Sequence, residues 1–326
     1  MAPIYKIALI QLQPIPVNPQ ANFSAAEKYI RRAASQGCHL AVLPEYHLTS
    51  WVPEDPNFIS SSRESVSYLA KYQALARDLN INIVPGTICE VHPASSSSTS
   101  QDAGAAANNL SSALPGQPDV ELRNMTYFLA AGSGELLGTY QKKNLWHPER
   151  PHLTAGAALE PHSAFSVPSL PPIYPNREVK VGLLVCWDLA FPEPFRALVA
   201  QGADIIVVPS YWYMSDVDEA ARRFNPDCER LFLGSTLVAR AYENTVCVVY
   251  CNAGGLSQVA MPVVGGLGTF GTAEEEEGRG EEGEFRVVEV DMEILRVAEE
   301  NYRVREDMAR EGWHYRYALA PKGKGE

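Results

Sequence analysis

The chain has 326 residues, of which 46% are hydrophobic and 20% are charged, proportions that indicate a globular protein with a large buried core. The formal net charge of −12 argues against nucleic acid or an anionic membrane as a main partner, because both would repel the protein. No apolar run approaches the ~18 residues of a membrane span. The first residues, MAPIYKIALIQLQP, do not have the pattern of a signal peptide.

The cysteines indicate a reducing compartment. None of them forms a CxxC pair, and six are too few for a disulfide framework in so long a chain. We therefore expect free thiols in a cytoplasmic protein. The cysteines are Cys38, Cys89, Cys186, Cys228, Cys247 and Cys251.

Strand-like and helix-like segments alternate in the first part of the chain. Short apolar runs predict strands, and longer amphipathic segments predict helices. The helix expected over 18–37 has suitable ends, because Asn18 can cap its first turn and Gly37 stands where a helix commonly stops. The predicted strands are 5–12, 39–45 and 81–91, and the predicted helices are 18–37 and 61–80.

A low-complexity insert interrupts this pattern. Residues 93–119 are rich in Ser, Ala and Gly and have almost no bulky apolar side chains. Such a segment buries too little surface to offset the entropy of ordering it, so we predict a surface loop. Two strand-like runs follow within 124–142 around a Gly-Ser-Gly turn, which predicts a β-hairpin.

The alternation continues to the end of the chain. The predicted strands are 179–185, 203–210, 246–253 and 285–292, and the predicted helices are 192–202 and 230–244. Residues 272–284, rich in Glu and Gly, predict a solvated acidic loop, and 306–326 form a C-terminal tail. We find no internal repeat and no second domain, so we expect one layered α/β (α+β) domain over 1–326.

Three chemically useful residues follow predicted strands. Glu45 ends the strand HLAVLPE, Lys142 ends LLGTYQK, and Cys186 lies just beyond VKVGLLV and before a helix. A buried cysteine, an ion pair at a strand end and an exposed lysine would each explain one of them alone. If the three strands run parallel in one sheet, however, their side chains converge at one edge, where open α/β folds bind ligands.

A thiol, a carboxylate and an ammonium group can together perform acyl transfer. A thiol needs a base to take its proton, and the oxyanion of the intermediate needs a positive group. The helix that begins after Cys186 should also favour negative charge and so lower the pKa of its thiol. This set works without histidine or a metal.

Three ordered motifs around these residues resemble the nitrilase, or carbon–nitrogen hydrolase, superfamily. The motifs are LPEYHLTSW (43–51), GTYQKKNLWHPER (138–150) and GLLVCWDLAFPEPFR (182–196), and VARAYENTVCVVYCN (238–252) resembles the family's next helix and strand. The resemblance implies an α-β-β-α sandwich whose subunits pair through helices, as a homodimer or a larger homo-oligomer. It implies Glu45 as the general base, Lys142 as the catalytic lysine, Cys186 as the nucleophile and Glu149 as a supporting glutamate.

Two positions depart from the family pattern. Gln141 stands where many members have arginine, and the glycine-rich segment after Pro262 matches only loosely. Neither departure removes a catalytic group.

The resemblance also implies a mechanism and a kind of substrate. The backbone N–H of Trp187 would assist Lys142 in binding the oxyanion, and the substrate would be a small amide or carbamoyl amide. Asp188 stands where nitrile-hydrolysing members usually carry glutamate, which favours the amidase branch over a nitrilase. A redox-sensing protein on the same scaffold is the non-enzymatic alternative, although a sensor would need neither Glu45 nor Lys142. The residues expected to line the pocket are Tyr46, Trp187, Ser210, Tyr211 and Trp212.

Two further motifs suggest a dinucleotide site and a zinc site, but each lacks the neighbouring residues that such a site needs. Gly266, Gly268 and Gly271 spell GxGxxG, yet the pattern runs into a block of glutamates that would repel a phosphate. His147 and His152 lie in HPERPH, but no P-C-x-x-C follows to complete a zinc-deaminase site. We expect neither a metal nor an organic cofactor.

Overall fold

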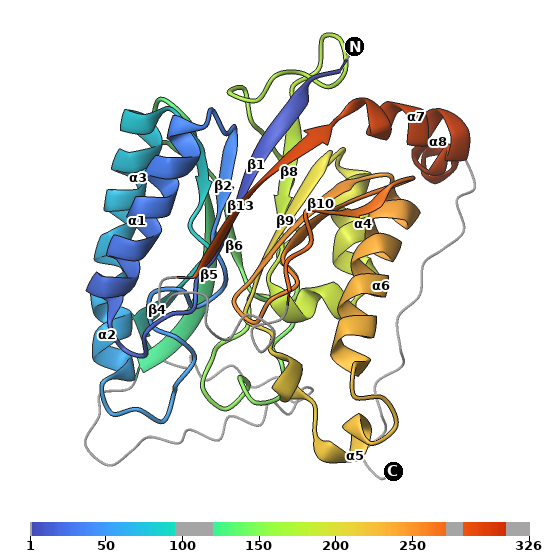
Figure 1. Ribbon diagram of the computed structural model, residues 1–326. Helices are drawn as coiled ribbons and strands as arrows, with labels where there is room; N and C mark the ends of the chain where they lie inside the picture. Colours follow the sequence, from blue (N-terminus) through green and yellow to red (C-terminus); the bar gives the residue numbers. More distant parts are fainter. Residues whose placement is uncertain (1, 95–119, 272–282, 311–326) are drawn as a thin grey trace, which may run out of the picture.

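The computed structural model describes residues 2–94, 120–271 and 283–310. Two β-sheets pack face to face, and helices cover the outer face of each, so the layers are α-β-β-α (Figure 1). This arrangement confirms the expected sandwich. Within the described residues no helix is long and apolar enough to cross a membrane.

The first sheet has seven strands, in the order β13-β1-β2-β3-β5-β4, with β6 paired to β5. Helices α1 (Pro19–Ser35), α2 (Phe58–Ser65) and α3 (Ser67–Leu79) lie beside it (Figure 1). The strands are β1 (Ile4–Gln11), β2 (Leu40–Val42), β3 (Asn82–Val84), β4 (Thr87–Pro93), β5 (Val120–Leu129), β6 (Leu136–Gln141) and β13 (Glu284–Asp291).

The second sheet has six strands, in the order β12-β11-β10-β9-β8-β7. Helices α4 (Pro192–Ala200) and α6 (Cys228–Asn244) cover it. The strands are β7 (Phe165–Ser166), β8 (Lys180–Leu183), β9 (Ile205–Ser210), β10 (Cys247–Asn252), β11 (Gln258–Met261) and β12 (Gly265–Leu267). The shorter helices are η1 (Cys186–Ala190), η2 (Met214–Asp216), α5 (Glu219–Arg222), α7 (Glu293–Tyr302) and α8 (Val304–Ala309).

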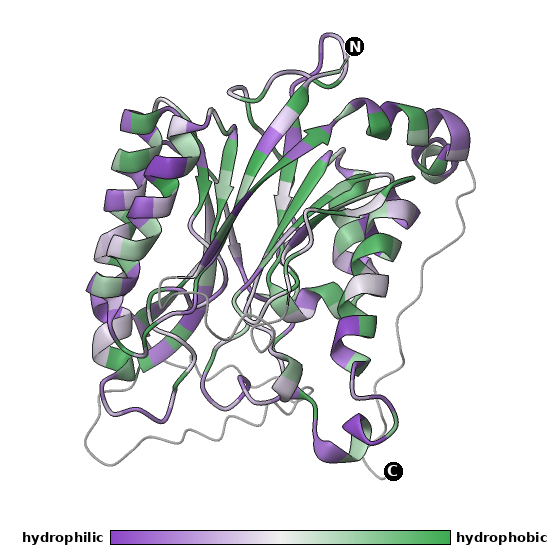
Figure 2. Ribbon diagram, viewed as in Figure 1, coloured by the Kyte–Doolittle hydropathy of each residue, from purple (hydrophilic) through white to green (hydrophobic). Residues whose placement is uncertain are grey.

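Strand β1 shows why the central strands are almost wholly apolar. Ile7 and Leu9 belong to the hydrophobic cluster between the two sheets, whereas Ala8 and Ile10 belong to the cluster beneath α1 and α3. Successive side chains of a strand point to opposite faces, so a strand covered on both faces needs apolar residues throughout. Figure 2 shows this hydrophobic interior between helices with polar outer surfaces.

Most of the expected elements are confirmed, and α1 keeps its expected ends. The side chain of Asn18 accepts a hydrogen bond from Ala21 N, and Gly37 has a φ of 70°. The hairpin expected within 124–142 is the antiparallel pair β5 and β6.

Two expected elements are each divided. The helix expected over 61–80 is two helices, α2 and α3, which meet at Val66. The Ser65 hydroxyl donates to the carbonyl of Ser61 at 2.7 Å, a bond from a side chain to the preceding turn that often bends helices. The strand expected over 81–91 is interrupted at Gly86, where φ is 61° and a Cβ would collide with the Pro44 carbonyl.

The expected loops and tail fall mainly outside the described residues. Of the insert 93–119, Pro93 ends β4, and 95–119 lie outside. Of the acidic loop 272–284, Glu284 opens β13, and 272–282 lie outside. Of the C-terminal tail expected over 306–326, residues 306–309 belong to α8, and 311–326 lie outside.

Candidate active site

The Cys186 thiol lies at a sharp turn between β8 and η1. Cys186 has a φ of 46°, a left-handed conformation that costs a non-glycine residue about 1–3 kcal/mol and persists only where the surroundings hold it. Asp188 supplies that support, because its Oδ2 accepts from Val185 N at 2.9 Å. The side chain of Cys186 is 6% exposed, so the turn presents a nearly buried thiol.

Asp188 also connects this turn to β6 and to the segment that follows it. Its Oδ2 accepts from the Tyr140 hydroxyl at 2.9 Å, and its Oδ1 accepts from Asn144 Nδ2 at 2.8 Å. These bonds tie the thiol's turn to the segment that carries Lys142. Asp188, considered in the sequence only as a marker of the family branch, therefore has a positioning role.

Glu45 follows β2, and its carboxylate accepts hydrogen bonds from three groups. One carboxylate oxygen accepts from Lys142 Nζ at 2.8 Å and from Asn124 Nδ2 at 2.7 Å, and the other accepts from Tyr211 N at 3.0 Å. Its carboxylate and the Cys186 thiol are close enough to influence each other's pKa. Asn124 was missed by the sequence reasoning, although a polar side chain on an otherwise buried strand is the signal that could have found it.

Lys142 follows β6, and its ammonium group lies between two carboxylates. Its Nζ is 2.8 Å from Glu45 Oε1 and 2.7 Å from Glu149 Oε1, and the lysine is 1% exposed. Glu149 also accepts from the Tyr46 hydroxyl at 2.5 Å and from Trp146 N at 2.8 Å. Glu149 is thus held in place and in turn fixes the lysine.

The sequence analysis considered the strands before Glu45, Lys142 and Cys186 as parts of one sheet, but they lie in two different sheets. β2 and β6 belong to the first sheet and β8 to the second. The side chains meet because the sheets face each other and their ends coincide, and Glu45 N donates to Ser210 O across the two at 3.2 Å. The expected convergence therefore occurs at one end of the sandwich.

Burial dominates the electrostatics of this cluster. It raises the pKa of Glu45 to about 7, against the attraction of Lys142. Burial alone would lower the pKa of Lys142, but the surrounding carboxylates outweigh it and raise that pKa.

The pKa of the Cys186 thiol is also raised, by burial first and by Glu45 second, although Lys142 opposes the shift. The expectation that the following helix lowers this pKa is wrong, because the loss of water outweighs the helix. The resting thiol is protonated, and a base that titrates near neutral pH lies beside it.

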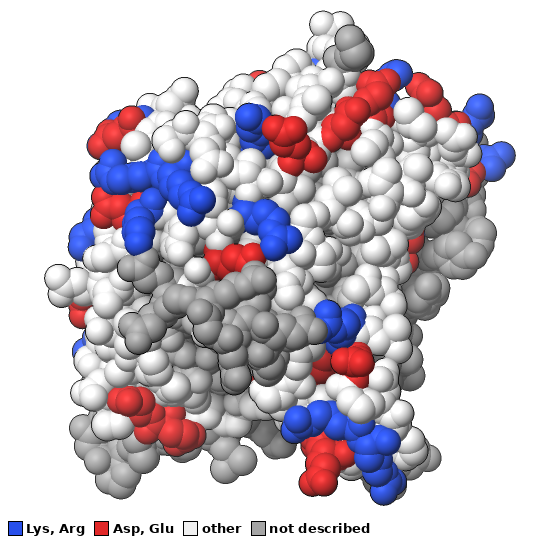
Figure 3. Space-filling model, in the orientation of Figure 1, with Lys and Arg blue, Asp and Glu red and all other residues white. Residues whose placement is uncertain are grey.

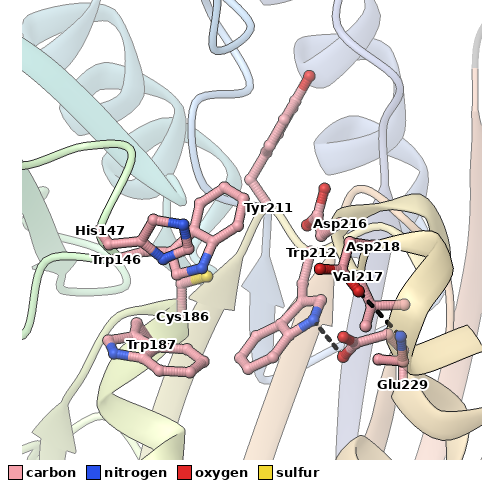
Figure 4. A pocket seen from close by; sticks show the side chains of 11 residues that line it. Trp146, His147, Cys186, Trp187, Tyr211, Trp212, Asp216, Val217, Asp218 and Glu229 are labelled. Atoms are coloured by element: carbon pink, nitrogen blue, oxygen red, sulfur yellow. Dashed lines mark hydrogen bonds between the residues drawn. The ribbon is translucent and has the colours of Figure 1, made fainter.

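A pocket of about 390 Å³ opens above the thiol (Figure 4). Trp187, Tyr211 and Trp212 line it, in the positions that the sequence analysis expected. The remaining lining residues are Trp146, His147, Cys186, Asp216, Val217, Asp218, Ala221 and Glu229. Trp146 and His147 could have been found from their place in the lysine motif, whereas the residues around α5 carry no recognisable signal.

Two residues expected in the pocket do not line it. Tyr46 is 2% exposed, with its hydroxyl on Glu149, and Ser210 is fully buried, 3.0 Å from the Tyr250 hydroxyl. Both contact the buried cluster instead, Tyr46 through Glu149 and Ser210 through its carbonyl, which accepts from Glu45 N. The backbone N–H of Trp187 lies directly after the thiol, at the start of η1.

The structure places the glycine motif at a strand and turn, and it places the two histidines of the other motif apart from any cluster of metal ligands among the described residues. Gly266 lies in β12, which continues an antiparallel pairing with β11, and Gly268 follows with a φ of 62°. His152 lies 3.5 Å from Glu54, and His147 lines the pocket. Among the residues that the structure describes, no three His, Cys, Asp or Glu side chains gather as metal ligands. All six cysteines are free thiols.

Curated proteins with similar sequences include enzymes named for amide and nitrile chemistry. The nitrilase of Pyrococcus abyssi is 28% identical over 215 residues, which are 63% of this chain and 64% of that protein. The deaminated glutathione amidase of Bos taurus is 30% identical over 209 residues, which are 63% of this chain and 55% of that protein. The chain thus matches less than two thirds of the length of these relatives.

A solved structure of similar fold and a family model also match this chain. An amidase from Nesterenkonia sp. AN1 has a similar fold, with a TM-score of 0.62 at 23% identity over 93% of this chain and 98% of that one. The model of the carbon-nitrogen hydrolase family matches residues 6–300. Because that match covers most of the sequence, the chain belongs to the carbon–nitrogen hydrolase family.

Proposed function

We propose that the protein hydrolyses small amides to a carboxylic acid and ammonia or an amine, through a thioester on Cys186. The observation that carries the proposal is the buried cluster in which the Cys186 thiol, the Glu45 carboxylate and the Lys142 ammonium group meet beneath a pocket. The amidases among the similar proteins favour the same chemistry.

Acylation begins with a proton transfer. Glu45 accepts the thiol proton as the sulfur attacks the amide carbon, so the thiolate forms only when its electrons are used. This order suits a thiol whose pKa is raised and a carboxyl group whose pKa is raised to about 7. The protonated Glu45 then gives its proton to the leaving nitrogen, the C–N bond breaks, and the thioester remains.

Hydrolysis of the thioester uses the same groups. The Glu45 carboxylate takes a proton from water, and the hydroxide attacks the thioester carbon. The C–S bond breaks, the sulfur recovers the proton from Glu45, and the acid leaves. In both acylation and thioester hydrolysis, Lys142 and the backbone N–H of Trp187 stabilise the oxyanion.

The supporting residues keep this set in place. Glu149 balances the ammonium charge and fixes Lys142, and Tyr46 holds Glu149 through its hydroxyl. Asn124 donates to Glu45 and orients its carboxylate. Trp187, Tyr211 and Trp212 would contact the substrate in the pocket.

The test is a screen of the purified protein for ammonia release from amides, ureido acids and nitriles. The proposal expects turnover of amides or carbamoyl amides by the wild type, and none by a folded Cys186→Ala variant. Turnover confined to nitriles would instead support a nitrilase, the activity named for one similar protein. Failure on every class, with a thiol that oxidises readily and reversibly, would support a redox sensor.

The expected assembly and location remain part of the proposal. We propose a homodimer or a larger homo-oligomer in the cytoplasm, acting on a small molecule without a metal or organic cofactor. Light scattering of the purified protein tests the assembly, and turnover after exhaustive chelation tests the metal. A monomer in solution, or activity lost on chelation and restored by zinc, would contradict these expectations.

A further inference from the structure

Three carboxylates, those of Asp216, Asp218 and Glu229, line the pocket on the side away from the thiol. In Figure 4 the Trp212 ring stands between Cys186 and the carboxylates of Asp218 and Glu229. Asp218 precedes α5, and Glu229 lies in the first turn of α6. The pocket therefore has a reactive end at the sandwich and an acidic end formed by a separate segment.

Among the described residues, Asp218 and Glu229 each have one carboxylate oxygen that accepts no hydrogen bond from another side chain or backbone group. Asp218 Oδ1 accepts from Ala221 N at 2.9 Å, and Glu229 Oε2 accepts from Trp212 Nε1 at 2.7 Å. Among the described residues neither carboxylate forms an ion pair. Asp216 lines the same wall, but it accepts from Tyr213 N at 2.9 Å, and we assign it no part.

No lysine or arginine among the described residues lines the pocket and could neutralise this end. Arg222 and Arg223 near α5 are exposed and do not line it. Figure 3 shows charges of both signs side by side at that corner of the surface, so any attraction on a ligand acts by direct contact rather than through a long-range field.

The walls between the two ends are aromatic. The rings of Trp187 and Trp212 lie 5.3 Å apart, centroid to centroid, and both face the pocket with Trp146. Such walls pack against an aliphatic chain and also attract a cation over their faces. The pocket thus combines a thiol, an apolar passage and a pair of carboxylates.

We infer that the pocket selects primary amides whose acyl chain ends in a cationic group, an ammonium or a guanidinium. Asp218 and Glu229 hold the cation while the chain lies along Trp187 and Trp212 and the amide reaches Cys186. A neutral chain end would displace water from both carboxylates without giving them a partner, which penalises uncharged substrates. The inference rests on the proposed amidase function.

The first experiment compares three linear amides of similar length: 5-aminopentanamide, hexanamide and glutaramate. With the wild type, kcat/KM should be about tenfold or more higher for the ammonium-terminated amide than for hexanamide, and lowest for the carboxylate. Added salt should raise KM for 5-aminopentanamide alone, because it screens a partly exposed ion pair. Equal values for the first two amides, or a preference for glutaramate, would overturn the inference.

The second experiment removes each charge while keeping each hydrogen bond. Asp218→Asn can still cap α5, and Glu229→Gln can still accept from Trp212. Each variant should lower the preference for 5-aminopentanamide over hexanamide about tenfold. Glu219→Gln, which removes a neighbouring exposed charge outside the pocket, should keep the wild-type ratio. An unchanged ratio in both pocket variants would overturn the inference.

Binding separates this inference from the proposed function. In a Cys186→Ala background, calorimetry should detect 5-aminopentanamide and lose about tenfold in affinity when Asp218→Asn is added. Turnover of all amides without charge preference would overturn the inference and leave the amidase proposal standing. Charge-dependent binding with no turnover of any amide by the wild type would overturn the amidase proposal and leave the preference for a cationic ligand standing. Binding that is insensitive to Asp218→Asn and Glu229→Gln would again overturn the inference.

Discussion

Replacing Lys142 by methionine removes one charge from a buried cluster of three. The ammonium group lies 2.8 Å from Glu45 and 2.7 Å from Glu149, and all three side chains are at most 3% exposed. Methionine has a similar length and no charge, so the change tests the charge rather than the packing. Lys143→Met is the matched control, because it removes the same charge at the next position, outside the buried cluster.

The structure gives the size and the pH dependence of the loss in stability. Removing one partner of a buried ion pair costs about 3–5 kcal/mol, because the remaining charges have neither water nor a counter-ion. The carboxylates can escape by binding a proton. The pKa of Glu45 is already raised from 4.5 to about 7, and without Lys142 it should rise further.

A carboxyl group with a raised folded-state pKa stabilises the fold below its unfolded pKa, and this contribution is lost as the pH rises through the folded pKa. The deficit of Lys142→Met should therefore be small at about pH 5 and large at about pH 8. Turnover should fall about 10²–10³-fold at either pH, because one oxyanion donor is lost.

Urea unfolding of the wild type, Lys142→Met and Lys143→Met at those two pH values measures the first effect, and steady-state amide hydrolysis measures the second. Alkylation of Cys186 near neutral pH should also slow in Lys142→Met, since Lys142 lowers the pKa of the thiol. A Lys142→Met variant as stable as Lys143→Met at the higher pH would refute the electrostatic reasoning. Turnover within a few-fold of wild type would refute the role of Lys142 at the oxyanion.

Three further predictions concern the base and the insert. Glu45→Gln should slow both thioester formation and thioester hydrolysis in rapid-quench experiments, and a normal acylation burst would contradict its role as the first base. In the wild type, kcat/KM for a neutral amide should fall as the pH drops below about 7, because Glu45 must be ionised to take the thiol proton, and a profile flat over the acid range would argue against this. Replacing 93–119 by a short Gly/Ser linker should leave Tm and turnover nearly unaltered, whereas a large loss of either would show that the insert packs on the body or shapes the pocket.

The sequence predicts the secondary-structure elements well, for local reasons, and it singles out the candidate catalytic residues. Continuous apolar runs such as 203–210 identify strands buried on both faces, and Asn18 and Gly37 identify the ends of a helix. Glu45, Lys142 and Cys186 stand out because polar groups directly after such strands need a partner or a task. Their motifs then give the family.

The features that depend on distant packing could not be predicted in the same way. Whether β2 and β8 share a sheet depends on how two sheets face each other, which no local pattern encodes. The raised pKa of Cys186 follows mainly from burial, which outweighs a helix that can be seen in the sequence. The acidic wall of the pocket includes Asp218 and Glu229, which carry no signal in the sequence and line one pocket with Trp212 only in the folded chain.

The proposal that Cys186 forms a thioester has a direct test. The wild-type enzyme is mixed with a slowly hydrolysed amide, quenched in acid during turnover, and analysed by intact-mass spectrometry and peptide mapping. We predict an added mass equal to the acyl group, located on the peptide that carries Cys186, removable by hydroxylamine and absent from Cys186→Ala. Acylation of a different residue, or steady amide turnover by folded Cys186→Ala, would contradict the mechanism.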